Sequence, residues 1–121
     1  MISILRHKNA IYSVSNGKRV KLFNSLDLDA VRCLLVAYRA FYASDVEDYF
    51  TEQVKPVACA YSQATSKGVL QVINTCNIYG STIACIRLCK ADRQITILNS
   101  VTLTMAKRIA KSLIKLDRLE G

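Results

Sequence analysis

Cationic side chains interleaved with tyrosines are the residues of this sequence whose type and spacing could do chemistry. The chain has 17 Lys and Arg against 9 Asp and Glu, a formal net charge of +8 over 121 residues. Residues 1–25 contain five bases and no acid, whereas residues 26–55 contain six acids and three bases. This uneven, strongly positive charge favours a polyanionic partner over a neutral one.

A basic sheet surface with aromatic side chains suits a single nucleic-acid strand, because cations neutralise phosphates and every base offers a face for stacking. We therefore predict binding of single-stranded DNA or RNA. The predicted contacts are Arg6, Lys8, Tyr12, Lys18, Arg19, Lys21, Tyr61, Lys67, Arg87, Lys90 and Arg93. The alternative is a basic surface that serves solubility, with the tyrosines as ordinary half-buried strand residues.

Catalysis finds little support in the sequence. Nucleophilic catalysis needs a base, usually His, and the one histidine, His7, stands between Arg6 and Lys8 with no Ser or Cys tied to it by spacing. The four glycines are isolated, so there is no glycine-rich phosphate loop. We predict no catalytic residue, no enzyme activity, no cofactor and no small-molecule substrate. The acidic cluster at 45–52 is expected to be a solvated face or a docking patch.

The five cysteines show no metal-binding pattern. If their segment is extended, Cys85 and Cys89 lie about 13 Å apart at ~3.3 Å per residue, too far to share one zinc ion. Cytosolic thiols are normally reduced. We expect small apolar core residues and no metal site.

The elements that must position the cations begin with strands and a long helix. The expected strands of the first part are 2–5, 11–15 and 19–23. Asn16-Gly17 predicts a tight hairpin between the last two, because both central positions of a type I′ turn need positive φ. Asp29 is expected to cap a helix over 30–42. This helix is apolar almost all round, so it should be buried or lie at a subunit interface, and we predict a homodimer.

The second part predicts a short helix over 44–53 and then an antiparallel meander that ends in a helix. The expected strands are 57–62, 68–75, 81–90 and 94–98. A final amphipathic helix over 105–116, capped by Thr104, carries Lys107, Lys111 and Lys115 at intervals of four. The fold class is therefore α+β, with antiparallel sheet or sheets and two main helices, in a single domain over 1–121.

An internal repeat is also predicted. An offset of 75 positions places 11–41 on 86–116 and aligns Asn24-Ser25 with Asn99-Ser100. The pattern predicts a duplicated strand, strand and helix unit, over 9–42 and again over 81–118. The alternative is that any two transitions from strand to helix look alike.

The segment Val101-Thr-Leu-Thr104, which leads from a strand into an amphipathic helix, resembles the end of the single-stranded-DNA-binding core of the transcriptional positive-coactivator family. The Whirly proteins are similar, since they hold two sheet-plus-helix units in one chain. The resemblance covers 81–118, with a fainter echo at 9–42, and implies a curved four-stranded antiparallel sheet followed by a helix. This sequence departs from the pattern because it has no Trp and its first unit is a strand short.

The leading hypothesis is thus a small nucleic-acid-binding protein of the cytoplasm or nucleoid, acting in transcription, replication or recombination. The alternative is a protein–protein interaction module, such as an inhibitor or a small regulatory subunit, that docks through the apolar helix 30–42. A third interpretation makes the lysine row of the last helix a membrane-surface or partner-binding element. No membrane span is expected, because the apolar stretch 30–42 is shorter than ~20 residues and contains Arg32 and Arg39.

Overall fold

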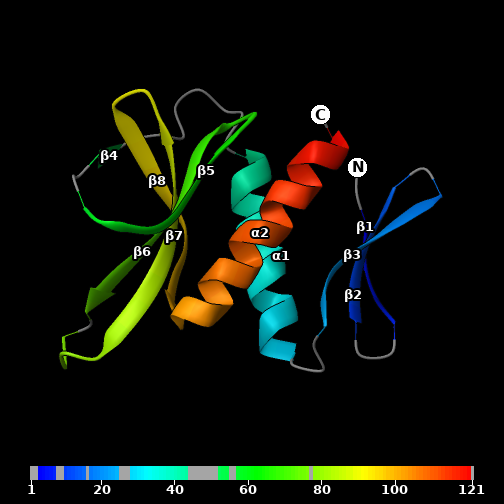
Figure 1. The fold of residues 1–121 in the computed structure, drawn as a ribbon, viewed down its shortest axis with the longest axis horizontal. Coiled ribbons are helices and arrows are strands. Elements are labelled where there is room, and N and C mark those ends of the chain that lie inside the picture. Colours follow the sequence, from blue (N-terminus) through cyan, green and yellow to red (C-terminus); the bar gives the residue numbers. More distant parts are fainter. Residues whose placement is uncertain are drawn as a thin grey trace.

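The computed structural model describes residues 3–7, 10–15, 17–24, 28–43, 52–54, 57–76 and 78–120. Over these residues the chain forms two helices and two antiparallel sheets, which confirms the α+β class (Figure 1). One sheet has three strands in the order β1-β2-β3, and the other has five in the order β4-β8-β7-β6-β5.

The three-stranded sheet is formed by the N-terminal segment. Its strands are β1 (Ser3–His7), β2 (Ala10–Ser15) and β3 (Lys18–Asn24). The predicted hairpin is confirmed, since Ser15 pairs with Lys18 and Gly17 has φ +76°, a conformation that glycine adopts without steric cost. A bulge at Ile11/Tyr12 shifts the register of β2 against β3.

The five-stranded sheet is a meander with one short added strand. The strands are β5 (Cys59–Thr65), β6 (Gly68–Cys76), β7 (Thr82–Lys90), β8 (Arg93–Val101) and β4 (Glu52–Gln53). All four predicted strands of the meander are confirmed. Gly68 is required at its turn, because its φ is +135° and an added Cβ would lie 2.4 Å from the carbonyl oxygen of Cys89.

The short helix predicted over 44–53 is wrong at its end. Glu52 and Gln53 form β4, which pairs antiparallel with Gln94 and Arg93 of β8. Residues 44–51 lie outside the described residues. A two-residue strand has too little sequence pattern of its own, and its conformation is set by the neighbouring strand.

The two helices, α1 (Leu28–Ala43) and α2 (Leu103–Glu120), each begin earlier than expected. Asp29 therefore lies in the first turn of α1 and does not cap it. Thr102, not Thr104, is the N-cap of α2, because its hydroxyl accepts a hydrogen bond from the Met105 amide at 3.2 Å.

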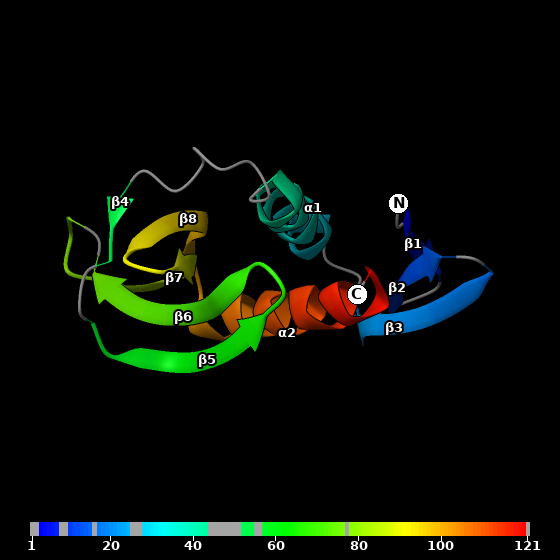
Figure 2. The ribbon, with the colours of Figure 1, turned by 90° about the horizontal axis from the view of Figure 1, so that it is seen from above.

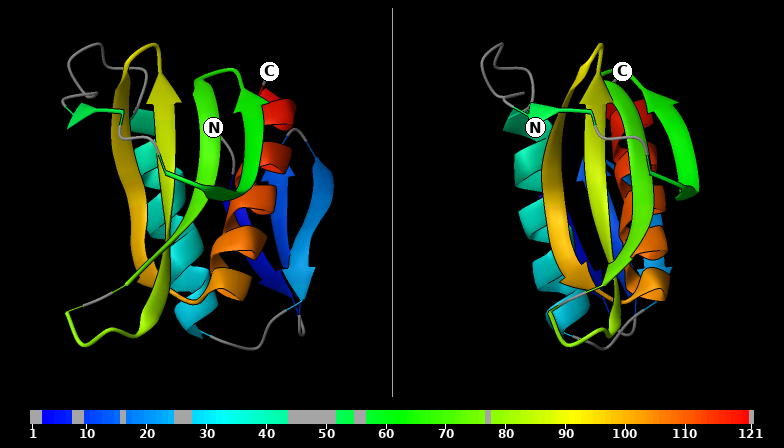
Figure 3. Two further views of the ribbon diagram at one scale, coloured as in Figure 1. Left: turned by 60° about the vertical axis from the view of Figure 1, so that its left-hand side comes forward. Right: turned by 90° about the vertical axis from the view of Figure 1, so that its left-hand side faces the viewer.

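The helix pair lies between the two sheets (Figures 1 and 2). The helices pack on each other, α1 also contacts β8, and α2 contacts β3 of the small sheet as well as β5 to β8 (Figure 3). One hydrophobic cluster draws residues from both sheets and both helices. Its largest fully buried members include Ile11, Leu34, Phe41, Leu70, Ile86, Leu88, Ile109, Leu113 and Leu116.

The apolar helix α1 is covered on one side by this chain itself. Leu34 and Ala37 are fully buried, whereas the opposite stripe, which contains Arg32 and Arg39, is exposed. Val36 lies on that stripe and is 54% exposed. The chain itself therefore buries one side of the helix, and only the outward stripe is left for a second subunit to cover.

Candidate nucleic-acid interface

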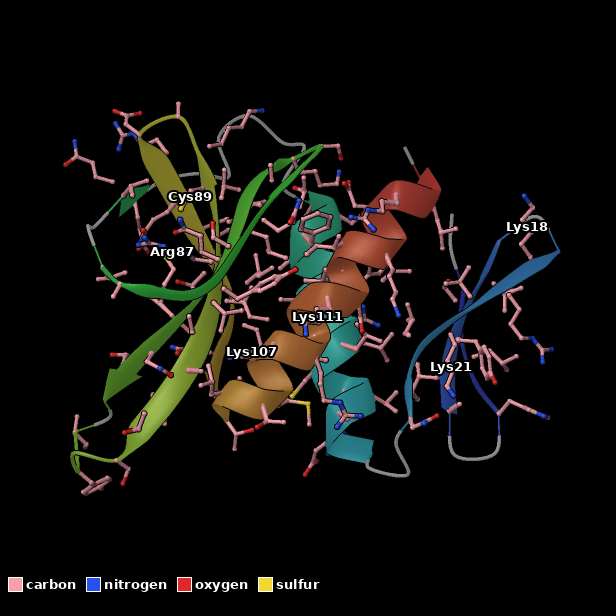
Figure 4. The ribbon with its side chains drawn as sticks, in the orientation of Figure 1. Lys18, Lys21, Arg87, Cys89, Lys107 and Lys111 are labelled. Carbon is pink, nitrogen blue, oxygen red and sulfur yellow. The ribbon has the colours of Figure 1, made fainter. Side chains whose placement is uncertain are left out.

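The predicted cations do not share one sheet face. Lys18, Arg19 and Lys21 lie on β3 of the small sheet, whereas Arg87, Lys90 and Arg93 belong to β7 and β8 of the large sheet. Figure 4 places Lys18 and Lys21 on the opposite side of the helix pair from Arg87. The expectation of a single basic sheet surface is therefore wrong, because the basic strands belong to different sheets.

Arg87 is not a surface cation, since only 3% of the residue is exposed. It lies between the core residues Ile86 and Leu88, so its side chain points to the face of the sheet away from the helices. Its Nε donates to Gln71 Oε1 at 2.7 Å, and its Nη1 donates to Gln94 Oε1 at 2.7 Å. This burial corrects the prediction that Arg87 contacts phosphate.

A network of hydrogen bonds around Arg87 connects four neighbouring strands. Gln71 is on β6 and Gln94 on β8, and Gln94 Nε2 donates to Glu52 Oε2 of β4 at 3.2 Å. We call these four residues the Arg87 cluster. Buried polar groups need such partners, because a desolvated donor or acceptor left unpaired costs about 1–3 kcal/mol. The cluster therefore joins the short edge strand β4 to the interior of the sheet.

Two thiols lie on the same face as Arg87. Burial raises the pKa of both Cys85 and Cys89, and the positive charge of Arg87 lowers them in part. Cys85 is buried and Cys89 half-buried, as expected of core cysteines, but Cys59 is exposed. Among the residues that the structure describes, no group of three or more His, Cys, Asp or Glu is arranged to hold a metal ion.

Cations instead gather on the exposed face of α2. Lys111, Lys115 and Arg118 line a pocket of about 210 Å³ together with Ile114 and Tyr61 of β5. Lys111 Nζ is 6.0 Å from the centre of the Tyr61 ring. Tyr61, a predicted contact, thus lies beside helix cations and not beside the strand cations.

The same helix face is bonded to the small sheet. Lys115 Nζ donates to the backbone oxygen of Lys21 at 3.2 Å, and Arg108 Nη2 donates to the backbone oxygen of Asn24. We define the α2 basic surface as Lys21, Tyr61, Lys111, Lys115 and Arg118. Lys107 is half-buried one turn before Lys111 and on the same side of α2 (Figure 4). The surface extends from the edge strand of one sheet to the edge strand of the other.

Asp117 of α2 is held by the turn between β5 and β6. Its carboxylate accepts hydrogen bonds from the Ser66 amide at 3.0 Å and from the Ser66 hydroxyl. Lys67 in the same turn is half-buried, with its Nζ 5.4 Å from the ring centre of Tyr42 and 5.8 Å from that of Phe41. Lys67, a predicted contact, is thus engaged with aromatic rings of α1.

A second, smaller patch lies on the small sheet. Tyr12 pairs with Lys21 and Val14 pairs with Arg19, so Arg19 and Lys21 share a face, as expected from strand alternation. The Arg19 guanidinium carbon is 5.5 Å from the centre of the Tyr12 ring. Lys18 is exposed at the hairpin turn.

The remaining predicted contacts are dispersed. Lys90 and Arg93 are exposed at the turn between β7 and β8, where Arg93 Nε lies 4.0 Å from a carboxylate oxygen of Asp92. Arg6 is part of β1, but its side chain and all of Lys8 lie outside the described residues. The predicted contacts do not include Lys111, Lys115 and Arg118, although their spacing of four and three residues already marks one helix face.

Comparison with models of known families, with curated proteins and with solved structures finds no match to this chain. Within its described part, neither helix is long and apolar enough to cross a bilayer. A function for this chain can therefore be proposed only from the geometry and chemistry of the site.

Proposed function

We propose that this protein binds single-stranded nucleic acid, DNA or RNA, through the α2 basic surface. The observation that carries the proposal is the convergence of Lys111, Lys115 and Arg118 on one pocket beside an aromatic ring. The proposal includes no catalytic step, no cofactor and no small-molecule substrate. In this proposal the main contact with phosphates is the exposed face of α2, and not a sheet face as the sequence predicted.

The geometry suits a phosphodiester chain. Residues four apart on a helix lie about 6 Å apart along its axis, so Lys107, Lys111 and Lys115 form a row of regularly spaced charges. Lys111, Lys115 and Arg118 are exposed, and the net charge of +8 adds a long-range attraction for a polyanion. Phosphate neutralisation by Lys and Arg releases counterions and supplies most of the affinity of sequence-independent binding.

The likeness to the coactivator and Whirly families remains part of the proposal. It is supported by two antiparallel sheets, each leading through its last strand into a helix, in the order β1-β2-β3-α1 and β5-β6-β7-β8-α2. Such binding would serve transcription, replication or recombination in the cytoplasm or nucleoid.

The test is a titration of a fluorescent single-stranded oligonucleotide at several salt concentrations. Each of Lys111→Gln, Lys115→Gln and Arg118→Gln should lower the slope of log affinity against log salt by about 0.7, the value for one phosphate contact on a single strand. Arg93→Gln is the matched control, because it removes an exposed cation far from α2, and should leave the slope unchanged. Equal slopes for all variants, or no binding by the wild type at low salt, would contradict the proposal.

A second candidate function uses the outward stripe of α1. Val36 is 54% and Tyr42 52% exposed, with the cations Arg32 and Arg39 on the same stripe. Such a mixed face suits a protein partner with apolar and acidic groups, and the predicted homodimer would use it as well. Light scattering of the wild type and of Val36→Glu tests the dimer: a dimer mass that Val36→Glu reduces to a monomer supports it, and a monomeric wild type removes it.

A further inference from the structure

The turn between β6 and β7 exposes two neighbouring large apolar side chains. Ile78 is 91% exposed and Tyr79 is 85% exposed, far more than any other large apolar residue in the described part of the chain. An added Cβ at Gly80 in the same turn would meet no atom within 4 Å. Folding buries little of these two side chains. Packing within the fold therefore does not explain why large apolar residues stand at these positions.

The turn is held away from the body by a long hairpin. β6 and β7 pair without interruption from Val69 with Cys89 to Cys76 with Thr82. In Figures 1 and 3 the end of this hairpin projects at the lower left, beyond the beginning of α2. α2 contacts both strands of the hairpin, so the projecting turn and the α2 basic surface belong to one packed unit.

The chemistry of the hairpin differs from that of the α2 basic surface. The sequence has no charged residue between Lys67 and Arg87. Near the turn, the exposed neighbours are Asn74, Thr75, Ser81 and Thr82, which offer small hydrogen-bonding groups. The turn therefore cannot neutralise phosphates, but it suits the uncharged faces and edges of bases.

The size of the patch limits its partner. A specific protein interface buries about 800 Å² on each side, which two side chains cannot supply. Binding to a lipid surface likewise scales with the buried apolar area. Base stacking needs much less, because one aromatic side chain accommodates one base, and isoleucine is among the side chains that wedge between stacked bases.

We propose that Ile78 and Tyr79 insert against the bases of the nucleic-acid strand whose phosphates lie on the α2 basic surface. This inference rests on the proposed function and adds a second, uncharged contact to it. Phosphate contacts on α2 supply salt-dependent affinity, and the hairpin turn supplies stacking that depends little on salt. Because every base has a stacking face, the turn accepts any sequence.

The test compares the wild type with a double variant that carries both Ile78→Ser and Tyr79→Ser. The probe is a single-stranded oligonucleotide that contains the fluorescent base 2-aminopurine. The double variant should bind about tenfold more weakly with an unchanged salt slope, and should lose the fluorescence change that reports altered stacking. An oligonucleotide of abasic sites should bind both proteins equally. Val57→Ser, which truncates an exposed apolar side chain outside the proposed surfaces, is the matched control and should behave as the wild type.

The outcomes separate the two proposals. If the wild type binds with a steep salt slope and the double variant binds equally well, the hairpin inference is overturned and the α2 basic surface stands. If the wild type does not bind the oligonucleotide at low salt, both fail. If phosphatidylserine vesicles bind the wild type but not the double variant, while oligonucleotide affinity is equal, the hairpin inference is replaced by a lipid contact.

Discussion

The two strand, strand and helix segments of the chain, β2-β3-α1 and β7-β8-α2, have the same order of elements and very different surfaces. An offset of 75 residues carries the first residue of β3, Lys18, onto that of β8, Arg93, and the first residue of α1, Leu28, onto that of α2, Leu103. Buried residues also coincide. The pairs are Ile11 with Ile86, Leu22 with Ile97, Leu34 with Ile109, Ala37 with Ser112 and Phe41 with Leu116.

The surfaces differ because the same positions contact different neighbours. Tyr12 is half-buried on the outer face of the small sheet, whereas its counterpart Arg87 is enclosed by the Arg87 cluster. On the helices, Val36 of α1 corresponds to Lys111 of α2. Packing thus constrains the core positions of both units alike, while the surface positions are available for different partners. The internal repeat over 9–42 and 81–118 remains a prediction.

The largest expected effect tests whether the two units form one core. Leu34→Ala and Ile109→Ala each remove a fully buried side chain at matched positions, and each should lower the free energy of unfolding by about 2–5 kcal/mol. Both variants should unfold in a single transition in urea, followed by circular dichroism and tyrosine fluorescence. Two separate transitions, with each variant shifting only its own, would show that the units are independent domains.

A difference between matched positions is expected on the outer faces of the sheets. Arg87→Ala removes the donor to two glutamine oxygens and should cost about 2–6 kcal/mol, at about 1–3 kcal/mol for each acceptor. Tyr12→Ala at the matched position should cost only about 1–2 kcal/mol, since its ring is half exposed and contacts the Arg19 cation. Urea denaturation of both variants measures the difference. Equal costs would mean that the Arg87 cluster does not stabilise the large sheet.

The smallest effect has the opposite sign. Ser13 is fully buried where the second unit has Leu88, and within the described residues its hydroxyl has no hydrogen-bond partner. Ser13→Ala removes this desolvated group and should raise the free energy of unfolding by about 0.5–1 kcal/mol. The control is Ser112→Ala, whose hydroxyl donates to the Arg108 backbone oxygen at 2.9 Å. A loss of stability in Ser13→Ala beyond that of the control would show that the hydroxyl is paired.

Local patterns of the sequence predicted most of the fold. Alternation and the Asn16-Gly17 turn are properties of neighbouring residues, so the strands and the first hairpin were confirmed to within a few positions. β4 was missed because only its pairing with β8 makes it a strand. The cap of α2 was placed two residues late, because Thr102 and Thr104 are equally good capping residues and the strand end decides between them.

The site was harder to predict because it depends on topology. Nothing in the sequence says that Lys21 and Arg87 belong to different sheets, or that Gln71 and Gln94 enclose the guanidinium of Arg87. The lysine row of the last helix was visible from its spacing, but its neighbour Tyr61 lies 50 residues before Lys111 in the sequence. Only the packing of α2 against β5 brings the ring and the cation together.

The bonds from α2 to the small sheet have a consequence for synthesis of the protein. Lys115 and Arg108 bond to the backbone of Lys21 and Asn24, segments separated by 94 and 84 residues. On the ribosome, β1, β2 and β3 emerge well before the helix that packs against β3. The nascent three-stranded sheet therefore stays without this packing partner until α2 has also been synthesised. A message truncated before α2 should yield a polypeptide that proteases and chaperones recognise, although its first hairpin is already present.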